Sequence, residues 1–461
     1  MTTSRRAVRP VDDVWLAMDQ PDNLMVVESL MVVGGDLDRA TYLELLRDRL
    51  LEPYPRFRQR ARWSWLPWPG QWWEDDPHFD LERHVHEATL PEPGDDAALQ
   101  DYVSGHLSRA LDRGHPPWEA HVVHGYAGGT AIYTRLHHAL ADGTALFRVV
   151  MSMADEDLAG GTDGTPEGGE QGGEQGGGPD GVQDGRAEAG TIARLRSLPG
   201  TAVRSASGAR RLASTPIVAE HLVLARRPAS PLSGPPHHAK LAVWAPPIDV
   251  ADLRTLRQAT GTTVTDVVMA AVAGALRRWL DDHGGTPGKD LPTMVPVDLR
   301  GAAALRPDDL GNQFALVLLD LPVTADTALG RLTETAARMA AIKRSPEAWL
   351  TFGLLEAMGV VHPRVRVRVT DFFARKATGV TTSVRGPDVP LHLAGRPITR
   401  MWAWAPMSAD QTISTSIIGY GGQVHVGFKV DAAAVPDPDL LVAGLRAELD
   451  ELRELGGTGR V

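Results

Sequence analysis

The chain of 461 residues contains no cysteine. This absence excludes a disulfide framework, metal sites held by thiolates, and a cysteine nucleophile that would carry a covalent acyl group. Lysine is also scarce, since only five of the 47 basic residues are Lys. We therefore expect anions to be bound mainly by arginine, whose planar guanidinium suits carboxylates and phosphates. The net charge of −11 argues against a general affinity for nucleic acid.

Long apolar runs are missing as well. The longest, Val264–Leu276, includes Thr265 and Asp266 and is shorter than the roughly 20 residues that cross the hydrocarbon layer of a membrane. The N-terminal residues are basic but are not followed by an apolar segment, so we expect no signal peptide. The sequence thus predicts a cytoplasmic protein, and peripheral contact with the inner face of the cell membrane or with lipid droplets is kept as an alternative.

The chain is long enough for two packed domains, and 43% of its residues are hydrophobic. Residues 160–190 contain thirteen glycines and almost no apolar side chain, so they cannot repay the entropy of becoming ordered. We predict an N-terminal domain of residues 1–156, a disordered linker of residues 157–190 and a C-terminal domain of residues 191–461. Helical and strand patterns alternate with hairpins among them, which predicts an α/β class with mixed sheets. Strands are predicted over 24–33 and 130–136, and helices over 38–51, 101–111, 143–153, 192–224 and 262–282.

The sequence has no Walker A motif, no GxSxG elbow and no HExxH zinc motif. The remaining candidate for chemistry is His137-His138-Ala139-Leu140-Ala141-Asp142-Gly143, at the end of a predicted apolar strand. Because successive strand side chains point to opposite faces, we expect one His in a cleft and the other in the supporting structure. An imidazole is well suited to accept a proton near neutral pH. Asp142 can fix the turn through its backbone or an Arg, and Gly143 permits a backbone angle that other residues resist.

Two simpler interpretations of this motif stay open. A histidine in a strand is more often a satisfied core residue than a catalytic one. A histidine and a carboxylate four residues apart can also contribute to a metal site, although one of each is a poor ligand set.

The motif resembles the HHxxxDG motif of acyltransferases with the chloramphenicol-acetyltransferase-like fold. The flanking sequence is similar to one family in particular, the bacterial wax ester synthase/diacylglycerol acyltransferases, and the similarity covers nearly the whole chain outside the Gly-rich segment. It implies two α/β domains with mixed sheets and an active site at their interface. The similar segments are Pro117–Glu119, Pro231–Pro235, Thr265–Leu280, Met294–Arg300, Leu310–Asn312, Gly386–Gly395 and Val435–Asp437.

The resemblance implies transfer of a fatty acyl group from acyl-CoA to a long-chain alcohol or diacylglycerol, giving wax ester or triacylglycerol. Acyl-CoA is then a substrate, and neither a cofactor nor a metal is expected. His138 is implied as the general base that removes the hydroxyl proton, so that the acceptor attacks the thioester directly. His137 is implied to support it. Asp142 is implied to be structural, with Arg300 as its expected partner, although Arg135 is nearer in sequence.

Further supporting positions follow from the same resemblance. Gly143 and Asp266 lie in segments that match the family, and Thr382, Ser383 and Asn312 are candidates to stabilise the oxyanion by residue type alone. The family usually carries Asn where this chain has Thr265, Ser383 and Ser414. Because Ser and Thr replace the donor and acceptor of Asn only in part, the reaction class is a safer expectation than the acceptor. The alternatives are another acceptor or a carrier-bound donor, a catalytically weak lipid-binding relative, and a metal hydrolase using the motif.

Two segments are candidates for lipid contact. Five tryptophans, among them Trp63 and Trp65, fall within residues 63–73. Trp favours membrane interfaces and apolar tunnels, but a hairpin packed on the core is an equally simple interpretation. Arg364, Arg366 and Arg368 alternate with Val, which predicts a strand with the three Arg on one face. This face would bind lipid headgroups or CoA phosphates, or be a solvated sheet edge.

Overall fold

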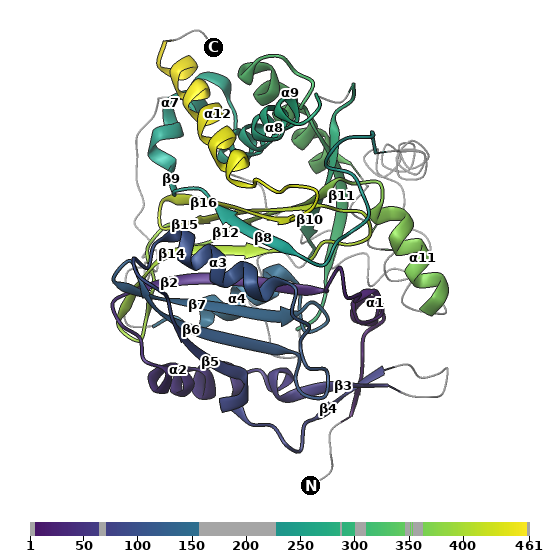
Figure 1. Ribbon diagram of the computed structural model, residues 1–461, viewed down its shortest axis with the longest axis vertical. Coiled ribbons are helices and arrows are strands. Elements are labelled where there is room, and N and C mark those ends of the chain that lie inside the picture. Colours follow the sequence, from purple (N-terminus) through teal and green to yellow (C-terminus); the bar gives the residue numbers. More distant parts are fainter. Residues whose placement is uncertain are drawn as a thin grey trace, which may run out of the picture.

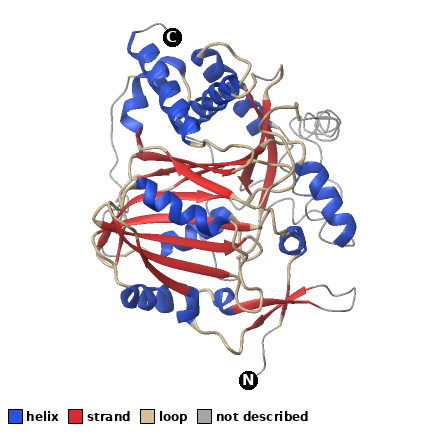
Figure 2. Ribbon diagram, in the orientation of Figure 1, coloured by secondary structure: helices blue, strands red, loops and turns tan. Residues whose placement is uncertain are grey.

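A computed structural model of the protein describes residues 5–63, 71–155, 227–285, 288–299, 310–345, 351, 353 and 363–458. The predicted linker of residues 157–190 and the predicted helix over 192–224 lie outside these residues. Two mixed sheets lie one above the other, with helices on their outer sides (Figures 1 and 2). The predicted α/β class with mixed sheets is thus confirmed.

The first sheet has six strands in the order β13-β14-β2-β7-β6-β5. All neighbours are antiparallel except β5 and β6, which are parallel. Two of its strands come from the C-terminal part of the chain, because β14 pairs along β2. Residues beyond the Gly-rich segment therefore contribute to both sheets. The strands are β2 (Val26–Gly34), β5 (Val85–Thr89), β6 (Trp118–Tyr126), β7 (Gly129–His137), β13 (His392–Leu393) and β14 (Arg396–Trp404).

The second sheet has the order β11-β10-β12-β15-β16-β8, and the short strand β9 also pairs with β16. β12 is parallel to both of its neighbours, and the remaining pairs are antiparallel. The strands β15 and β16 form an antiparallel hairpin near the C-terminus. The strands are β8 (Lys240–Trp244), β9 (Ile248–Asp249), β10 (Leu291–Asp298), β11 (Phe314–Leu321), β12 (Gly379–Arg385), β15 (Ile413–Tyr420) and β16 (Gln423–Asp431).

Helices cover the outer side of each sheet. Above the second sheet, α8 (Val264–Asp282) packs between α9 (Ala328–Arg344) and α12 (Asp439–Thr458), with α7 (Arg254–Thr260) beside them (Figure 1). Below the first sheet lies α2 (Arg39–Leu46), continued by a π-helical turn over Arg47–Leu51 (Figure 1). Two further helices lie between these upper and lower helices, both in the chain and in space. The first, α3 (Asp96–Leu107), packs against β8. The second, α4 (Gly143–Ser152), contributes apolar side chains to the core below the first sheet.

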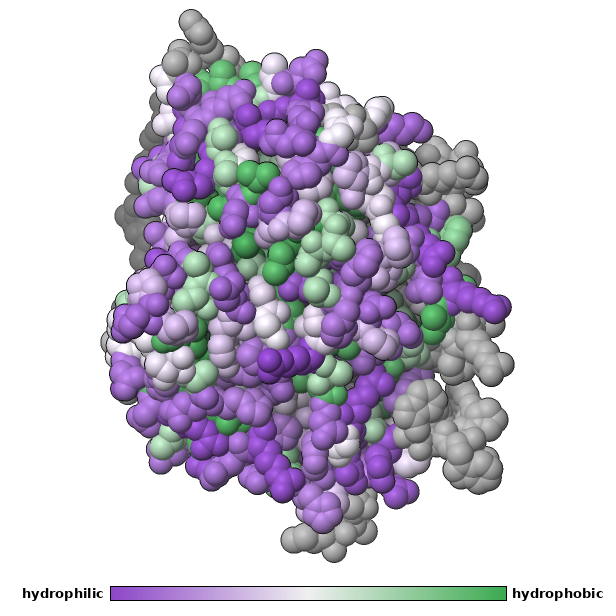
Figure 3. Space-filling model, in the orientation of Figure 1, coloured by the Kyte–Doolittle hydropathy of each residue, from purple (hydrophilic) through white to green (hydrophobic). Residues whose placement is uncertain are grey.

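Among the described residues no single helix is long and apolar enough to cross a membrane. The segments Val250–Thr260 and Val264–Asp282 reach the length and composition together, but with a bend of 97° between them. The surface shown in Figure 3 is predominantly hydrophilic, with apolar residues in small separate groups.

The predicted Arg-rich strand is wrong, because this segment is a helix, α11 (Pro363–Ala374), next to α1 (Pro10–Met18). Residues two positions apart in a helix are separated by about 200° around its axis, so alternation in the sequence does not place every second residue on one face. The side chains of Arg364 and Arg366 lie outside the described residues, so their predicted lipid contact stays a prediction. Pro363 is the first residue of α11, a position that suits proline. Arg368 is exposed.

The tryptophan-rich segment forms a hairpin of β3 (Gln59–Trp63) and β4 (Gln71–Asp75), and β1 (Arg6–Ala7) pairs with β4. Trp73 is fully buried, and the guanidinium carbon of Arg56 lies 4.5 Å from its ring centroid. The hairpin packed on the core is thus confirmed for Trp73. Trp65 and the side chain of Trp63 lie outside the described residues, so their predicted lipid contact stays a prediction.

Candidate active site

The sequence motif occupies the turn between β7 and α4. β7 ends at His137, and Asp142 caps α4, since its Oδ1 accepts a hydrogen bond from the backbone N–H of Ala145 at 2.9 Å. The turn is buried, and the backbone N–H of His138 donates to the carbonyl of Met25 at 2.8 Å. The predicted strand, turn and helix are therefore confirmed, and Asp142 does fix the turn through the backbone.

His138 lies in an aromatic environment. Its ring stacks on Trp15, with centroids 4.1 Å apart and planes 13° from parallel, and Phe314 lies 5.6 Å away on a tilted plane. Burial lowers the pKa of His138, while the negative charge of Asp142 acts in the opposite direction. The imidazole is consequently neutral at pH 7, the state in which it accepts a proton. Within the described residues its buried Nδ1 has no hydrogen-bond partner.

Asn312 holds the backbone of His138 in place. Its Nδ2 donates to the carbonyl oxygen of His138 at 2.9 Å and to Oδ1 of Asp12 at 2.8 Å. Both amide protons are therefore engaged, so the predicted role of Asn312 as an oxyanion donor is not supported by this arrangement. Asn312 instead positions the turn that carries His138.

Asp12 is a site residue that the sequence reasoning missed. It lies on α1, is fully buried, and accepts hydrogen bonds at Oδ1 from both the backbone and the side chain of Asn312. Burial raises its pKa to about 6, although the bonds from Asn312 and the charges of Arg56 and Arg9 lower it. The one available signal was a second acid in PVDDVW, an apolar helix segment in which a buried carboxylate needs a partner.

Asp142 joins the two halves of the chain. Besides Ala145, the backbone N–H of Gln313 donates to its Oδ2 at 2.9 Å, and this links the start of α4 to the start of β11. Arg135 is not its partner, because that guanidinium donates to Glu119 at 2.6 Å. The other predicted partner, Arg300, lies outside the described residues.

His137 points away from the site into a polar environment. Its Nδ1 accepts from the backbone N–H of Ala139 at 3.1 Å, and Nη2 of Arg113 lies 3.3 Å from its Nε2. Burial, together with the charge of Arg113, holds its pKa well below the ordinary value. His137 is therefore suited to support the turn and not to exchange protons with a substrate.

A large apolar cavity reaches His138 from both sides of the turn. It encloses about 1590 Å³ of empty space, including space open to solvent. One end extends below the first sheet toward α2 and α4, and the other lies between the two sheets. The lining at the first end includes Tyr42, Leu46, Leu50, Phe57, Val149 and Met153, and at the second end Met294, Thr382, Ser383, Trp402 and Gln411.

Of the predicted supporting residues, Thr382, Ser383 and Gly143 line this cavity. The Oγ1 of Thr382 is buried without a hydrogen-bond partner among the described residues. Gly143 is the first helical residue of α4, has no left-handed φ and has room for a Cβ. The expected reason for that glycine, an unusual backbone angle, is therefore wrong.

Asp266 is not part of the cavity lining. It forms a capping box with Thr263 at the start of α8, where its carboxylate accepts from the Thr263 backbone at 2.9 Å. Of the positions where the family carries Asn, Thr265 lies in the same first turn, and Ser414 is buried on β15. Only Ser383 among these three lines the cavity. Among the described residues, the motif is not part of a group of three potential metal ligands that converge on one point.

Two family models match the sequence. Residues 8–268 match the wax ester synthase/diacylglycerol acyltransferase catalytic domain, and residues 310–453 match the WS/DGAT C-terminal domain. A protein of Mycobacterium tuberculosis named a probable diacylglycerol O-acyltransferase is 29% identical over 432 residues, covering 91% of this chain and 89% of that protein.

Solved structures support the same fold. The wax ester synthase/diacylglycerol acyltransferase from Marinobacter aquaeolei VT8 superposes with a TM-score of 0.68 at 22% identity, covering 98% of this chain and 100% of that one. A starter condensation domain of rhizomide synthetase, in complex with C8-CoA and Leu-SNAC, gives a TM-score of 0.57 at 16% identity, covering 99% and 95%. At these identities the structures establish the fold, and the predicted chloramphenicol-acetyltransferase-like architecture is confirmed.

Proposed function

The chain belongs to the wax ester synthase/diacylglycerol acyltransferase family, and we propose that it transfers a fatty acyl group from acyl-CoA to a long-chain alcohol or diacylglycerol. The products are wax ester or triacylglycerol. The observation that carries this proposal is a buried, neutral imidazole, His138, in the wall of an apolar cavity. Such a cavity accommodates alkyl chains, and the imidazole supplies the base that an unactivated alcohol needs near neutral pH.

In the proposed reaction His138 removes the proton from the acceptor hydroxyl as its oxygen attacks the thioester carbonyl. The tetrahedral intermediate then collapses, the bond from carbon to sulfur breaks, and the proton returns from the imidazolium to the departing CoA thiolate. A general base at this position contributes roughly 10²–10⁴-fold to the rate. Thr382 is the candidate donor to the oxyanion, because its hydroxyl is buried in the cavity wall without another described partner.

This chemistry requires no cofactor, because both reactants bring the groups that react. Acyl-CoA enters as a substrate, and the condensation domain of similar fold was solved with C8-CoA. The absence of cysteine fits a direct transfer, in which no acyl group is held on a protein thiol. We propose no role for nucleic acid.

We further propose that the protein works in the cytoplasm at the surface of the membrane or of lipid droplets, where its acceptors partition. On α11, Phe372 is 48% exposed and Arg368 is also exposed, a combination of apolar and basic groups that suits an anionic lipid surface. Phe372→Ser should reduce co-sedimentation with anionic vesicles, and unchanged binding would remove α11 from the proposed contact.

The experiment that tests the reaction is CoA release from palmitoyl-CoA, with hexadecanol and dioleoylglycerol offered separately. His138→Ala should lower acceptor-dependent release by about 10²–10⁴-fold, while circular dichroism shows an intact fold. His78→Ala removes an exposed histidine and is the matched control. A folded His138→Ala variant with activity near wild type would contradict the assigned base. Folded wild-type protein with no release from either acceptor would contradict the proposed substrates.

A further inference from the structure

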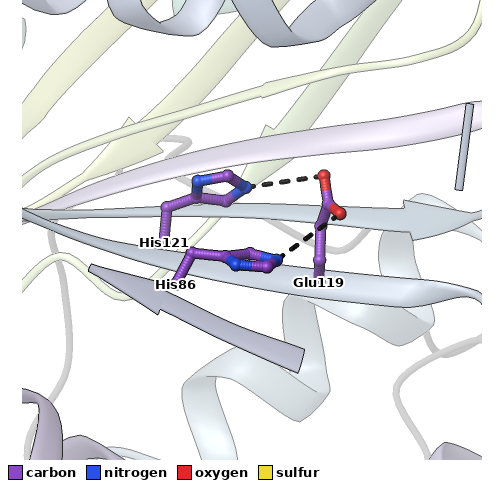
Figure 4. A group of neighbouring side chains, drawn as sticks. All are labelled: His86, Glu119 and His121. Carbon is purple, nitrogen blue, oxygen red and sulfur yellow. Dashed lines mark hydrogen bonds and ion pairs between the residues drawn. The ribbon is translucent and has the colours of Figure 1, made fainter. Parts of the chain in front are cut away.

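A second group of titratable side chains lies on the face of β6 that points away from the part of the cavity below the first sheet. Trp118 and Ala120 of β6 line the cavity. Since strand residues alternate between faces, Glu119 and His121 point to the other side. His86 of β5 pairs in register with His121, so both rings lie side by side on that face (Figure 4).

The potential ligand atoms of this group converge. Nε2 of His121 is 3.5 Å from Oε1 of Glu119, and Nε2 of His86 is 3.9 Å from Oε2 of the same carboxylate. All three ligand atoms lie within 4.8 Å of one another. A tetrahedral zinc ion with bonds of about 2.0–2.1 Å requires ligand atoms about 3.4 Å apart. Small rotations of the side chains therefore suffice to reach that geometry.

Surrounding contacts orient two of the three ligands. The hydroxyl of Tyr102 on α3 lies 2.8 Å from Nδ1 of His121, which leaves Nε2 of that ring to bind a metal ion together with the other two ligands. Arg135 donates to Oε1 of Glu119 at 2.6 Å, and this fixes the carboxylate. Outer hydrogen bonds of this kind are what hold metal-binding histidines and carboxylates in place.

The positive charge of Arg135 opposes a cation at this place, but it is shared. Arg135 also donates to the carbonyl of Arg109 and interacts with the charge of Glu28. The guanidinium of Arg135 donates to Oε1 of Glu119, whereas Oε2 is the oxygen that faces His86. A metal ion bound through Oε2 thus leaves the arginine bond in place.

We propose that His86, Glu119 and His121 bind one Zn²⁺ per chain, with a water molecule as the fourth ligand. Two imidazoles and one carboxylate form a ligand set that zinc favours. The side chain of His86 is 48% exposed, which gives the ion a path from solvent. The site links the edge strand β5 to β6 and includes none of the residues that line the cavity, so its function is to stabilise this sheet edge and not to take part in acyl transfer.

The test is zinc binding by tag-free protein, measured by competition with a chromophoric chelator and by metal analysis after dialysis. Wild type should bind one equivalent, and zinc should raise its melting temperature. His86→Gln should weaken binding at least tenfold and abolish the shift in melting temperature. This exposed position keeps the fold intact, whereas changes at Glu119 also remove the bond to Arg135.

Two controls separate this site from other histidines. His124→Gln should bind like wild type, because the two ring nitrogens of His124 each contact a different carboxylate, both at 2.9 Å, and share no point with a second histidine. His138→Ala should also bind one equivalent of zinc, since the proposed metal site is separate from the active site. Absence of stoichiometric binding to wild type, or equal affinity in His86→Gln, would overturn the proposal.

Discussion

The buried carboxyl group of Asp12 should make the stability of this protein depend on pH in a way that one substitution removes. Asp12 is fully buried, and its Oδ2 has no hydrogen-bond partner among the described residues. Burial raises its pKa from 3.8 to about 6. In Asp12→Asn the acceptor for Asn312 is retained and the titrating proton is lost.

The direction follows from the raised pKa. The stabilising contribution of the protonated form is complete below the unfolded-state pKa of 3.8 and is lost as the pH rises through about 6. At about 1.4 kcal/mol for each tenfold change in the ionisation equilibrium, the total loss is about 3 kcal/mol. About 2 kcal/mol of this should appear between pH 4.5 and pH 7. Other titrating groups are common to both proteins and cancel in their difference.

The assay is equilibrium unfolding in urea, followed by tryptophan fluorescence, for wild type and Asp12→Asn at several pH values. The stability of Asp12→Asn relative to wild type should rise by about 2 kcal/mol from pH 4.5 to pH 7. Asp13→Asn is the matched control, because it makes the same chemical change one residue later on α1, at a carboxylate bonded to Gln71. It shows how much of the change in stability with pH arises from replacing any Asp by Asn on this helix. Stability curves of wild type and Asp12→Asn that stay parallel across this range would refute the reasoning.

Three further predictions concern the cavity, the base and the contact between the sheets. Because burial holds the pKa of His138 below 6.5, kcat/KM for acyl transfer should be flat from about pH 7 to 8 and fall only at lower pH. A midpoint of this fall above pH 7 would contradict the assignment of His138 as the base. The carboxylate of Glu28 lies 2.7 Å from the buried ammonium of Lys429. Glu28→Gln should lower the free energy of unfolding in urea by about 3–5 kcal/mol, because the ammonium is then buried without its carboxylate. The double variant Glu28→Leu and Lys429→Met should recover most of this loss. Val149→Trp should block one end of the cavity and exclude about four methylenes of a long chain. At about 0.8 kcal/mol for each methylene, the ratio of kcat/KM for C16 over C8 substrates should fall by about 200-fold. An unchanged ratio would show that this end holds no chain.

Local signals in the sequence were sufficient for the motif and its supporting elements. The apolar run before His137 predicted β7, and Asp142 was expected to fix the turn, which it does by capping α4. The same kind of signal was missed for α3, which begins at Asp96 and not at the predicted residue 101, because Asp95 caps it through the backbone N–H of Ala98. A side chain that caps a helix acts within one turn, so these features are readable from neighbouring residues.

Contacts between distant residues were not readable in this way. Asn312 and Asp12 are 300 positions apart, and nothing in either segment indicates the other. The pairing of β14 with β2 brings a C-terminal strand into the first sheet, although the composition of the chain suggested a division at the Gly-rich segment. The Arg-rich segment failed for another reason, since alternating Arg and Val are compatible with a strand as well as a helix, and tertiary packing decides between them.

The position of His138 depends on both halves of the chain at once. Asp142, from the N-terminal half, accepts the backbone N–H of Gln313, while Asn312, from the C-terminal half, donates to the carbonyl of His138. Through these two neighbouring hydrogen bonds, each half fixes the backbone of the other. Trp15 from α1 and Phe314 from β11 then enclose the ring. Since burial by these groups is what keeps the imidazole neutral, the base acquires its reactive state only where the two sheets meet, and neither half alone contains the groups that produce it.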